Sequence, residues 1–377
     1  MVNKIKIKGL AGLLSWVNIV YNQYTMSTTL HILSNPSGIT HTRYRMEPFN
    51  VAALKFIENM QNRGYNIVHY GHESAGVTCE NVICVTNDEF NPPPDGDLML
   101  HRPHLIDIFN SRSIEEVGRR KKQGDMLLAF YGQANKPTLD AYPDLFCLEP
   151  SIGYPPEAVY APFRAFVSYS QMHYYYGLHG MLLKPSWYDA VIPNAFTPTE
   201  FEFSAEKEDY FMYLGRVNYD KGIDLCIQVT KQLGKQLVIA GPATDLRHLG
   251  YDKIPDHVEL VGYVNPEKRS AYLRKAQCLM APTHYIEPFG NIVAEAQFCG
   301  TPVLTTDWGG YVDSVVHGVT GYRCKDFKTF VDAASVIHKL DPHVCRQWAM
   351  QNFSDEVIHN KFDDWLQKIS RNNFYYV

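Results

Sequence analysis

Two glutamates separated by eight positions stand in the stretch Tyr285–Gly300, which reads YIEPFGNIVAEAQFCG. We expect a helix to begin after the Pro-Phe-Gly step, so that Glu287 precedes the helix and Glu295 lies two turns along it. The first amides of that helix, at Gly290 and Asn291, have no partner within the helix and favour an anion. Carboxylates accept hydrogen bonds from hydroxyl groups. A ligand with a sugar at one end, a ribose at the other and a diphosphate between them would satisfy this arrangement.

A simpler interpretation makes Glu287 a helix cap and Glu295 a surface residue. Glu295, however, has Ala294 and Ala296 beside it and Ile292 one turn back, which favours a largely buried position. A buried carboxylate without a partner is costly. The sequence therefore favours a ligand partner for Glu295.

A second candidate loop, Tyr213–Asp224, reads YLGRVNYDKGID and joins an expected strand to an expected helix. Its glycines, Gly215 and Gly222, allow the backbone to approach a ligand closely. Arg216 can hold phosphate oxygens in a bidentate fork, and Lys221 adds a point charge. The alternative is a solvated loop with two surface cations. The loop matches neither a P-loop nor a GxGxxG dinucleotide loop.

The chain alternates short apolar runs with helical patterns, which is typical of parallel sheets with crossover helices. A helix is expected over Pro48–Gly64, and a second helical pattern follows the Pro-rich loop Asn91–Asp97 and runs to about Lys122. The strands expected in the first half are Thr29–Ser34, Tyr65–Gly71, Asp125–Gly132, Asp144–Pro150, Ala165–Ser170 and Tyr188–Asn194.

A second alternating series follows the polar stretch Thr197–Asp209, which we interpret as a linker. Its expected strands are Tyr210–Gly215, Lys235–Gly241, His257–Val264, Gln277–Pro282 and Thr301–Asp307. Its expected helices are Gly222–Gly234, Pro266–Ala276 and Gly290–Gly300, and the chain is helical after about Phe327.

The sequence therefore predicts two doubly wound α/β domains that face each other across a cleft, with ligands at the carboxyl ends of the strands. The expected boundaries are an N-terminal extension over residues 1–25, a first Rossmann-like domain over 26–200 and a second over 201–355. A C-terminal helix over 356–377 is expected to cross back to the first domain.

These motifs resemble those of retaining glycosyltransferases of family 4, which have the GT-B fold of two Rossmann-like domains. EPFGNIVAE, from Glu287 to Glu295, matches the E-x7-E motif of that family, and YLGRVNYDKG is similar to its Gly-Arg…Lys-Gly loop. VIPNAF (Val191–Phe196) and the segment Gly300–Cys324 resemble two further family segments. The resemblance runs from about Ala165 to Cys324 with the four motifs in the family's order.

The resemblance implies a role for each matching residue. Arg216 and Lys221 would neutralise the donor diphosphate and stabilise it as the leaving group. Glu295 would bind the ribose hydroxyls, and Glu287 would contact the transferred sugar. Such enzymes retain the anomeric configuration and usually need no metal.

Backbone groups have expected roles as well. The resemblance implies that Phe289, Gly290 and Asn291 offer amides to sugar or phosphate, and that Gly262 and Tyr263 lie near the nucleotide base. Two cations and a helix start can supply the positive charge that Mg²⁺ supplies in other enzymes.

The N-terminal half departs from the family pattern. Gly38, in SNPSGITHTRY, is the only glycine of the loop that follows the first strand; it could admit a donor phosphate or serve as a turn glycine. Tyr131 stands where many family members have histidine. Glu149 could line the acceptor side or form a loop salt bridge. The remaining histidine candidates for the site are His41, His101, His104 and His173.

The composition is that of an ordinary globular protein. The chain has 377 residues, 45 % hydrophobic and 20 % charged, and a net charge of −5 gives no general case for nucleic acid or anionic membrane. The eight cysteines form no CxxC pair and no zinc spacing, so buried thiols in a reducing, cytoplasmic setting are expected.

The N-terminal extension carries three lysines before an apolar run, Gly9–Tyr21, which is shorter than the roughly 20 residues of a membrane span. It could be a non-essential extension or a targeting or membrane-anchoring segment, so membrane association stays open.

We therefore expect an enzyme of the EC 2.4 type that moves a sugar from a nucleotide-diphosphate sugar to a hydroxyl group. The acceptor could be a glycan, a lipid-linked or a protein-linked group; no cofactor, metal or nucleic acid is expected. The alternatives are a sugar-nucleotide epimerase of the GT-B fold and a non-catalytic sugar-binding protein of that fold.

Overall fold

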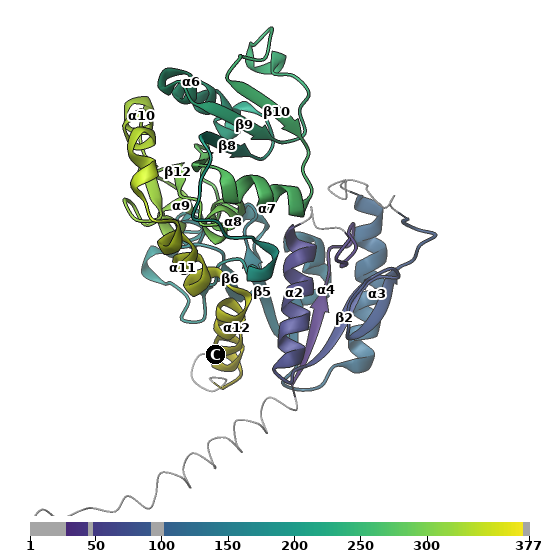
Figure 1. The fold of residues 1–377 in the computed structure, drawn as a ribbon. Helices are drawn as coiled ribbons and strands as arrows, with labels where there is room; N and C mark the ends of the chain where they lie inside the picture. Colours follow the sequence, from purple (N-terminus) through teal and green to yellow (C-terminus); the bar gives the residue numbers. More distant parts are fainter. Residues whose placement is uncertain (1–27, 44–47, 92–101, 372–377) are drawn as a thin grey trace, which may run out of the picture. The chain divides into compact units, whose positions relative to one another are not determined.

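The computed structural model describes residues 28–43, 48–91 and 102–371 (Figure 1). The N-terminal extension and the candidate His101 lie outside these residues. Two sheets organise the rest of the chain.

The first sheet has the strand order β3-β2-β1-β4-β5-β6-β7. β1 is buried along its whole length and runs parallel to both of its neighbours, β2 and β4. The strands are β1 (Thr29–Leu33), β2 (Asn66–His72), β3 (Glu80–Val85), β4 (Met126–Ala129), β5 (Phe146–Ile152), β6 (Phe163–Phe166) and β7 (Ala190–Val191).

The helices that accompany this sheet have local sequence causes. Leu54, Ile57 and Met60 recur at helical spacing in α2 and are buried, which orients the helix on the core. Ser168 caps α5 by accepting a hydrogen bond from the Gln171 amide. The helices are α2 (Pro48–Asn62), α3 (Pro103–Arg120), α4 (Lys136–Asp140) and α5 (Tyr169–Leu178).

Several elements differ from the sequence expectation, and α4 and α5 were not predicted. β3, the edge strand Glu80–Val85, was not predicted, and no helical pattern stands between it and β2 to mark it as a separate strand. The strand expected over Ala165–Ser170 ends at Phe166, and α5 begins three residues later.

The second sheet has the strand order β10-β9-β8-β11-β12-β13, and every neighbouring pair runs parallel. Successive residues of β8 enter opposite cores: Phe211 and Tyr213 pack into one, Met212 and Leu214 into the other. Both faces of this sheet are therefore covered. The strands are β8 (Tyr210–Leu214), β9 (Gln236–Ala240), β10 (Val258–Gly262), β11 (Cys278–Ala281), β12 (Val303–Thr306) and β13 (Gly321–Cys324).

The helices after β8 end in a helical C-terminal region, as expected. Trp365 of the last helix donates its indole N–H to the carbonyl oxygen of Tyr188, at 2.7 Å. The helices are α6 (Ile223–Leu233), α7 (Pro266–Lys275), α8 (Asn291–Phe298), α9 (Tyr311–Ser314), α10 (Phe327–Val336), α11 (Pro342–Phe353) and α12 (Asp355–Arg371).

The strand order of the second sheet, numbered along the chain, is 3-2-1-4-5-6. In such a sheet the first and fourth strands lie side by side and their following helices leave in opposite directions, which opens a crevice for ligands at the carboxyl ends. β8 and β11 are these two strands. The loops that follow them contain the candidate residues.

The α/β class, the two parallel sheets and the helical C-terminus are thus confirmed. Contact density divides the chain into two compact units, and Ala165–Lys368 falls in one unit with Ser151–Glu157. The domain boundaries given above and the facing cleft stay predictions. In the described residues no helix is both long and apolar enough to cross a lipid bilayer.

Candidate active site

The loop after β8 is held against the loop after β11. Gly222 has φ 71°, and a Cβ at this position would lie 1.9 Å from the carbonyl oxygen of Pro282. The amide of His284 donates to the carbonyl oxygen of Asp220 at 2.9 Å. Only a glycine therefore allows this approach, which brings Lys221 next to the second loop.

Lys221, Tyr285 and Glu287 form a hydrogen-bonded trio between the two loops. The Lys221 ammonium lies 2.7 Å from Oε2 of Glu287 and also donates to the Tyr285 hydroxyl, which itself donates to the same carboxylate oxygen at 2.6 Å. The side chains of Lys221 and Glu287 are only 19 % and 15 % exposed. Charge-assisted hydrogen bonds of this kind are among the stronger ones in proteins.

Tyr285 acts as a donor in this trio. Burial raises the pKa of its hydroxyl well above the ordinary value, and the negative charge of Glu287 raises it further. The positive charge of Arg216 acts in the opposite direction on this pKa. The hydroxyl therefore keeps its proton at neutral pH.

A third loop, which follows β12, fixes the backbone of Glu287. The Gly310 amide donates to the Glu287 carbonyl oxygen at 2.7 Å, and the Trp308 indole donates to the Tyr285 carbonyl oxygen at 3.1 Å. A Cβ on Gly309 would lie 2.7 Å from the Glu287 carbonyl oxygen. The resemblance to the family over Gly300–Cys324 therefore coincides with a segment that positions Glu287.

Arg216 follows β8 and is exposed. Its carbonyl oxygen accepts hydrogen bonds from the Tyr213 hydroxyl and the Asn218 amide, so the backbone is fixed while the side chain extends into solvent. Within the described part of the chain, its guanidinium forms no ion pair. The site thus has one cation already paired, Lys221, and one available for an anion.

The start of α8 presents backbone donors. Gly290 precedes the helix in the left-handed conformation, at φ 85° and ψ 68°, and packs on the buried ring of Tyr311. The Asn291 side chain accepts a hydrogen bond from Asn194 at 2.7 Å. Among the hydrogen bonds of the described residues, none uses the amides of Phe289, Gly290 or Asn291. A helix start with such amides favours an anion.

Glu295 lies in α8 and is 7 % exposed, so its predicted burial is confirmed. Its carboxylate Oε2 lies 3.2 Å from Nε of Arg269 on α7. The sequence argument assumed that Glu295 would have no protein partner, and Arg269 makes that assumption wrong. A ligand is therefore not required to neutralise Glu295.

Gly215 and Gly262 both contact a third glycine, Gly241, which follows β9. The Gly241 amide donates to the Gly262 carbonyl oxygen at 2.9 Å, and a Cβ on Gly241 would lie 2.1 Å from the Gly215 carbonyl oxygen. Tyr263 is 60 % exposed. The ends of β8, β9 and β10 thus meet closely at this edge of the sheet.

Gly38 and Tyr131 follow β1 and β4, the strands that form the equivalent switch point of the first sheet. Gly38 is buried, and a Cβ there would lie 2.5 Å from the Asn50 side-chain nitrogen. The Tyr131 ring packs edge-on against Phe49, with centroids 5.5 Å apart. The Gly38 amide donates to the Asn35 carbonyl oxygen at 3.0 Å, and both interpretations of this glycine stay predictions.

The described histidine candidates lie on separate elements. His41 accepts a hydrogen bond from the Arg43 amide in the loop after β1, His104 is exposed on α3, and His173 is exposed on α5. In residues 28–43, 48–91 and 102–371, no three His, Cys, Asp or Glu side chains are grouped so that they could hold a metal ion.

Glu149 binds backbone amides of a neighbouring segment. It lies within β5, is fully buried, and its Oε2 accepts hydrogen bonds from the amides of Tyr160 and Ala161 at 2.9 and 2.8 Å. Two backbone donors balance the buried carboxylate. Glu149 therefore anchors the 160–161 backbone.

Three contributors to the site were not singled out from the sequence: Tyr285, Asn194 and Arg269. Tyr285 stands two residues before Glu287, and Asn194 lies within the quoted VIPNAF segment, so both could have been suspected. The sequence around Arg269 does not indicate a role in the site, because its partner Glu295 lies on another helix.

A family model matches the second sheet and part of the C-terminal region. Residues 198–341 match the family model described as "Glycosyl transferases group 1". The glycogen synthase of Mycobacterium tuberculosis is 31 % identical over 171 residues, which cover 42 % of this chain and 41 % of that protein. The chain thus spans less than half the length of this relative.

Solved structures resemble nearly the whole chain. Sucrose-phosphate synthase from Thermosynechococcus elongatus has a TM-score of 0.66 at 15 % identity and covers 91 % of this chain and 99 % of its own. Anabaena HepE in complex with UDP-glucose has a TM-score of 0.62 at 14 % identity and covers 90 % of this chain and 99 % of its own. The chain therefore shares the two-sheet fold of these proteins, and its residues 198–341 match the group 1 glycosyl transferase family model.

Proposed function

We propose that this protein is a retaining glycosyltransferase of the family 4 type, which moves a sugar from a nucleotide-diphosphate sugar to an acceptor hydroxyl. The observation that carries the proposal is the convergence of Arg216, Lys221, Glu287 and the start of α8 at the β8/β11 switch point. The family match over residues 198–341 includes all of them.

The proposed chemistry follows from the charges at this edge. When the bond from the anomeric carbon to the diphosphate breaks, negative charge develops on the departing phosphate. Lys221 and the amides of Phe289 to Asn291 stabilise that charge, because they are held in place before the reaction begins. The exposed side chain of Arg216 adds a second cation. Lys221 can serve the phosphate while it is paired with Glu287, since its ammonium has three donors.

The two glutamates bind the two ends of the donor in this proposal. Glu287 accepts hydrogen bonds from hydroxyls of the transferred sugar through its second carboxylate oxygen. Glu295 accepts hydrogen bonds from the ribose, and the Arg269 guanidinium lies 3.2 Å from its carboxylate. Tyr263 and Gly262 lie beside the base.

Protein cations rather than a divalent metal balance the diphosphate charge in this proposal. We expect transfer to persist when a chelator is added, and loss of activity that Mg²⁺ restores would contradict this part. The acceptor is a hydroxyl of a glycan, a lipid-linked or a protein-linked group, in the cytoplasm.

A donor panel tests the proposed function. HepE was solved with UDP-glucose, so UDP-sugars come first, followed by GDP- and ADP-sugars. A donor that binds the folded state raises the melting temperature. Nuclear magnetic resonance of the product then distinguishes retention from inversion, and it reveals an epimerase if donor isomers interconvert without acceptor. If no nucleotide sugar binds, the proposal fails.

A further inference from the structure

Large apolar side chains are exposed together on α5 and the turn that follows it. Six of the sixteen exposed large hydrophobic side chains of the described residues come from this one stretch. We call it the α5–η3 surface, where η3 is the 3₁₀ turn Met181–Leu183. Its apolar members are Tyr169, Tyr174, Leu178, Leu182, Leu183 and Trp187.

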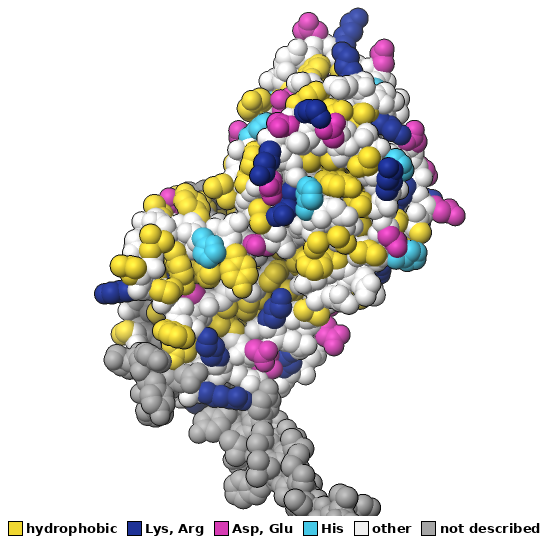
Figure 2. All heavy atoms as spheres, turned by 90° about the vertical axis from the view of Figure 1, so that its left-hand side faces the viewer, with side chains coloured by type: hydrophobic (Ala, Val, Ile, Leu, Met, Phe, Trp, Pro, Cys, Tyr) yellow, Lys and Arg dark blue, Asp and Glu magenta, His cyan; other side chains and the backbone are white. Residues whose placement is uncertain are grey.

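The exposure is greatest at the turn. Leu182 is 80 % exposed, Leu183 is 94 % exposed and Trp187 is 75 % exposed. Hydrophobic side chains also gather over parts of the face drawn in Figure 2. Soluble proteins rarely expose such groups side by side unless the surface has a binding role.

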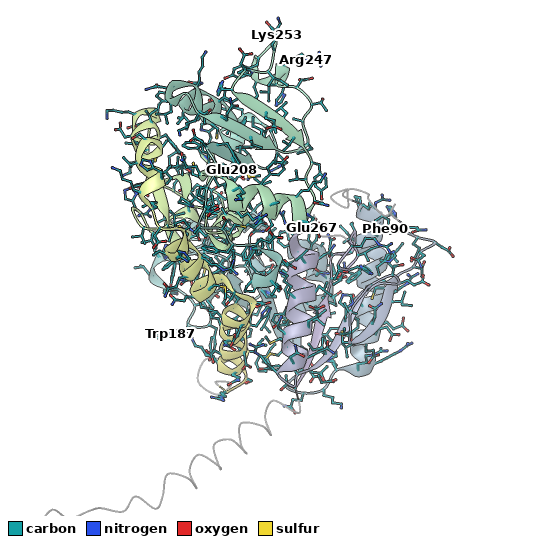
Figure 3. All side chains as sticks on the ribbon, in the orientation of Figure 1. Phe90, Trp187, Glu208, Arg247, Lys253 and Glu267 are labelled. Carbon is teal, nitrogen blue, oxygen red and sulfur yellow. The ribbon has the colours of Figure 1, made fainter. Side chains whose placement is uncertain are left out.

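The exposed tip, Leu182 to Trp187, is held by the elements on either side of it. Gly180 takes the left-handed conformation, at φ 64°, and directs the chain into η3. On the other side, α12 holds the backbone: Trp365 donates to the Tyr188 carbonyl oxygen and Lys368 donates to that of Trp187. Figure 3 shows Trp187 near α12 at the outer edge of the molecule.

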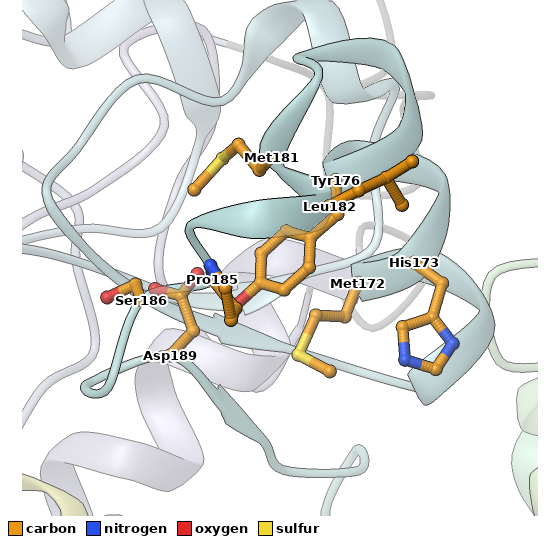
Figure 4. A pocket seen from close by; sticks show the side chains of 8 residues that line it. All are labelled: Met172, His173, Tyr176, Met181, Leu182, Pro185, Ser186 and Asp189. Carbon is orange, nitrogen blue, oxygen red and sulfur yellow. Dashed lines mark hydrogen bonds between the residues drawn. The ribbon is translucent and has the colours of Figure 1, made fainter.

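A cavity of about 490 Å³ lies behind the tip (Figure 4). The Tyr176 hydroxyl donates to Asp189 at 2.9 Å, so the carboxylate in the wall already has a hydrogen-bond donor. Leu182 belongs to both the cavity wall and the tip, which makes them one continuous apolar region. The apolar part of the wall is Met172, Tyr176, Met181, Leu182 and Pro185.

Two lysines stand in or beside the tip, whereas Asp189, directly after Tyr188, accepts a hydrogen bond from the Tyr176 hydroxyl in the cavity wall. From Ala158 to Tyr188 the chain contains no Asp or Glu. Lys184 stands directly after the two leucines and is exposed, and Lys368 lies beside Trp187. Phosphate headgroups attract such cations, and tryptophan and tyrosine prefer the boundary between headgroups and acyl chains.

We propose that the α5–η3 surface docks on a phospholipid bilayer. Leu182, Leu183 and Trp187 enter the boundary between headgroups and acyl chains, while Lys184 and Lys368 face the phosphates. A second copy of the chain is the competing occupant, and a two-fold interface centred on the tip would bring two Lys184 side chains together. The inference needs no sugar donor and does not depend on the proposed reaction.

Vesicle flotation with the full chain tests the proposal. The vesicles contain phosphatidylcholine with or without phosphatidylglycerol. We expect the double variant Leu182→Ser, Leu183→Ser to bind about tenfold or more weakly, because two apolar side chains no longer leave water. Lys184→Glu should weaken binding chiefly to the anionic vesicles. The matched control Ile254→Ser, Val319→Ser removes two exposed apolar side chains elsewhere and should bind as the wild type does.

A second measurement reports on Trp187 itself and separates this surface from the residues before 28. Brominated lipids should quench part of the tryptophan fluorescence of the wild type, and Trp187→Phe should abolish that part. The proposal is overturned if Trp187 is not quenched, or if the double leucine variant binds vesicles as the wild type does. It is equally overturned if the wild type ignores vesicles and light scattering shows a dimer that the leucine variant loses.

Discussion

Lys221 shows how individual side chains prepare the candidate site. Its ammonium lies between Tyr285 and Glu287, with its charge 4.8 Å above the Tyr285 ring. Glu287 is therefore neutralised before any ligand arrives, and it does not repel an approaching diphosphate. Such a carboxylate can serve sugar hydroxyls next to a phosphate site without a large electrostatic cost.

Removing either cation should slow transfer. Lys221→Met and Arg216→Ala each withdraw a positive charge from the leaving group, so we expect kcat/KM to fall about 100-fold or more. Steady-state kinetics with the donor found in the panel measures this effect. The controls are Lys253→Met and Arg247→Ala, two exposed positions between β9 and β10 that Figure 3 labels. Wild-type kinetics in both site variants would refute the assignment.

Glu295 should affect donor affinity. Glu295→Ala removes an acceptor for ribose hydroxyls, so donor dissociation constants should rise about tenfold or more. The variant also leaves Arg269 without its carboxylate partner, so Glu295→Gln is the companion variant that keeps an acceptor oxygen. Calorimetric titration measures both. Glu267→Ala on the exposed side of α7 is the control, and unchanged affinity in Glu295→Ala would exclude a ribose role.

At the scale of elements, two glycines flank α6 and differ in how closely other atoms surround them. Gly222 and Gly234 both adopt positive φ, at 71° and 62°. A Cβ on Gly222 would meet the Pro282 carbonyl oxygen, whereas a Cβ on Gly234 would meet nothing within 4 Å. The same backbone conformation thus terminates a helix at one end and joins two functional loops at the other.

This difference predicts two distinct outcomes. Gly234→Ala should cost only the left-handed backbone strain, about 1 kcal/mol. Gly222→Ala adds a steric clash with backbone, so its free energy of unfolding should fall further and Lys221 should move away from Glu287. Denaturant unfolding and donor binding measure the two effects. Equal behaviour of the variants would show that the contact with Pro282 does not hold the loops together.

The elements that the sequence predicted are those with a strong period and clear ends. β8, β11 and α8 carry buried apolar runs beside Gly and Pro, and they were found within two residues of their observed ends. α5 was missed because its tyrosines surround the helix and leave no single apolar face. β3 was missed because its exposed Ile83 and its edge position weaken the strand pattern.

Site residues could be predicted where a chemically suitable side chain directly follows an expected strand. Arg216, Lys221 and Glu287 could be named because each stands at a strand end, where parallel sheets bind ligands. The pairing of Glu295 with Arg269, and of Asn291 with Asn194, depends on residues that the fold brings together from distant segments. Such contacts are properties of packing and have no local sequence signal.

At the scale of the whole molecule, buried histidines give the first sheet a pH dependence. Burial lowers the pKa of His31, His69 and His72, and it lowers that of His69 to about 4. Asp125 opposes the shift at His31. The unfolded chain binds these protons more readily, so stability falls as pH drops from about 6.5 towards 4.

The expected loss from His69 alone is on the order of 3 kcal/mol across that pH window. Urea unfolding at several pH values should therefore show a steep decline in the wild type. His69→Gln, which can keep a hydrogen bond to Asn81 or Thr40, should decline less steeply. The exposed His104→Gln should follow the wild type, and an identical slope in His69→Gln would contradict the assignment.

The eight cysteines have a further consequence for the whole chain. All are free thiols, seven are buried and Cys79 is half-buried. Burial raises the pKa of each one, to about 11 at Cys79, so few thiolates exist at neutral pH. An alkylating reagent must wait for the surrounding structure to open before it reacts. The rate at which each thiol is alkylated therefore measures how often the structure around it opens. Mass spectrometry can resolve these rates for the individual cysteines and so compare the opening of the two sheets in the unmodified protein.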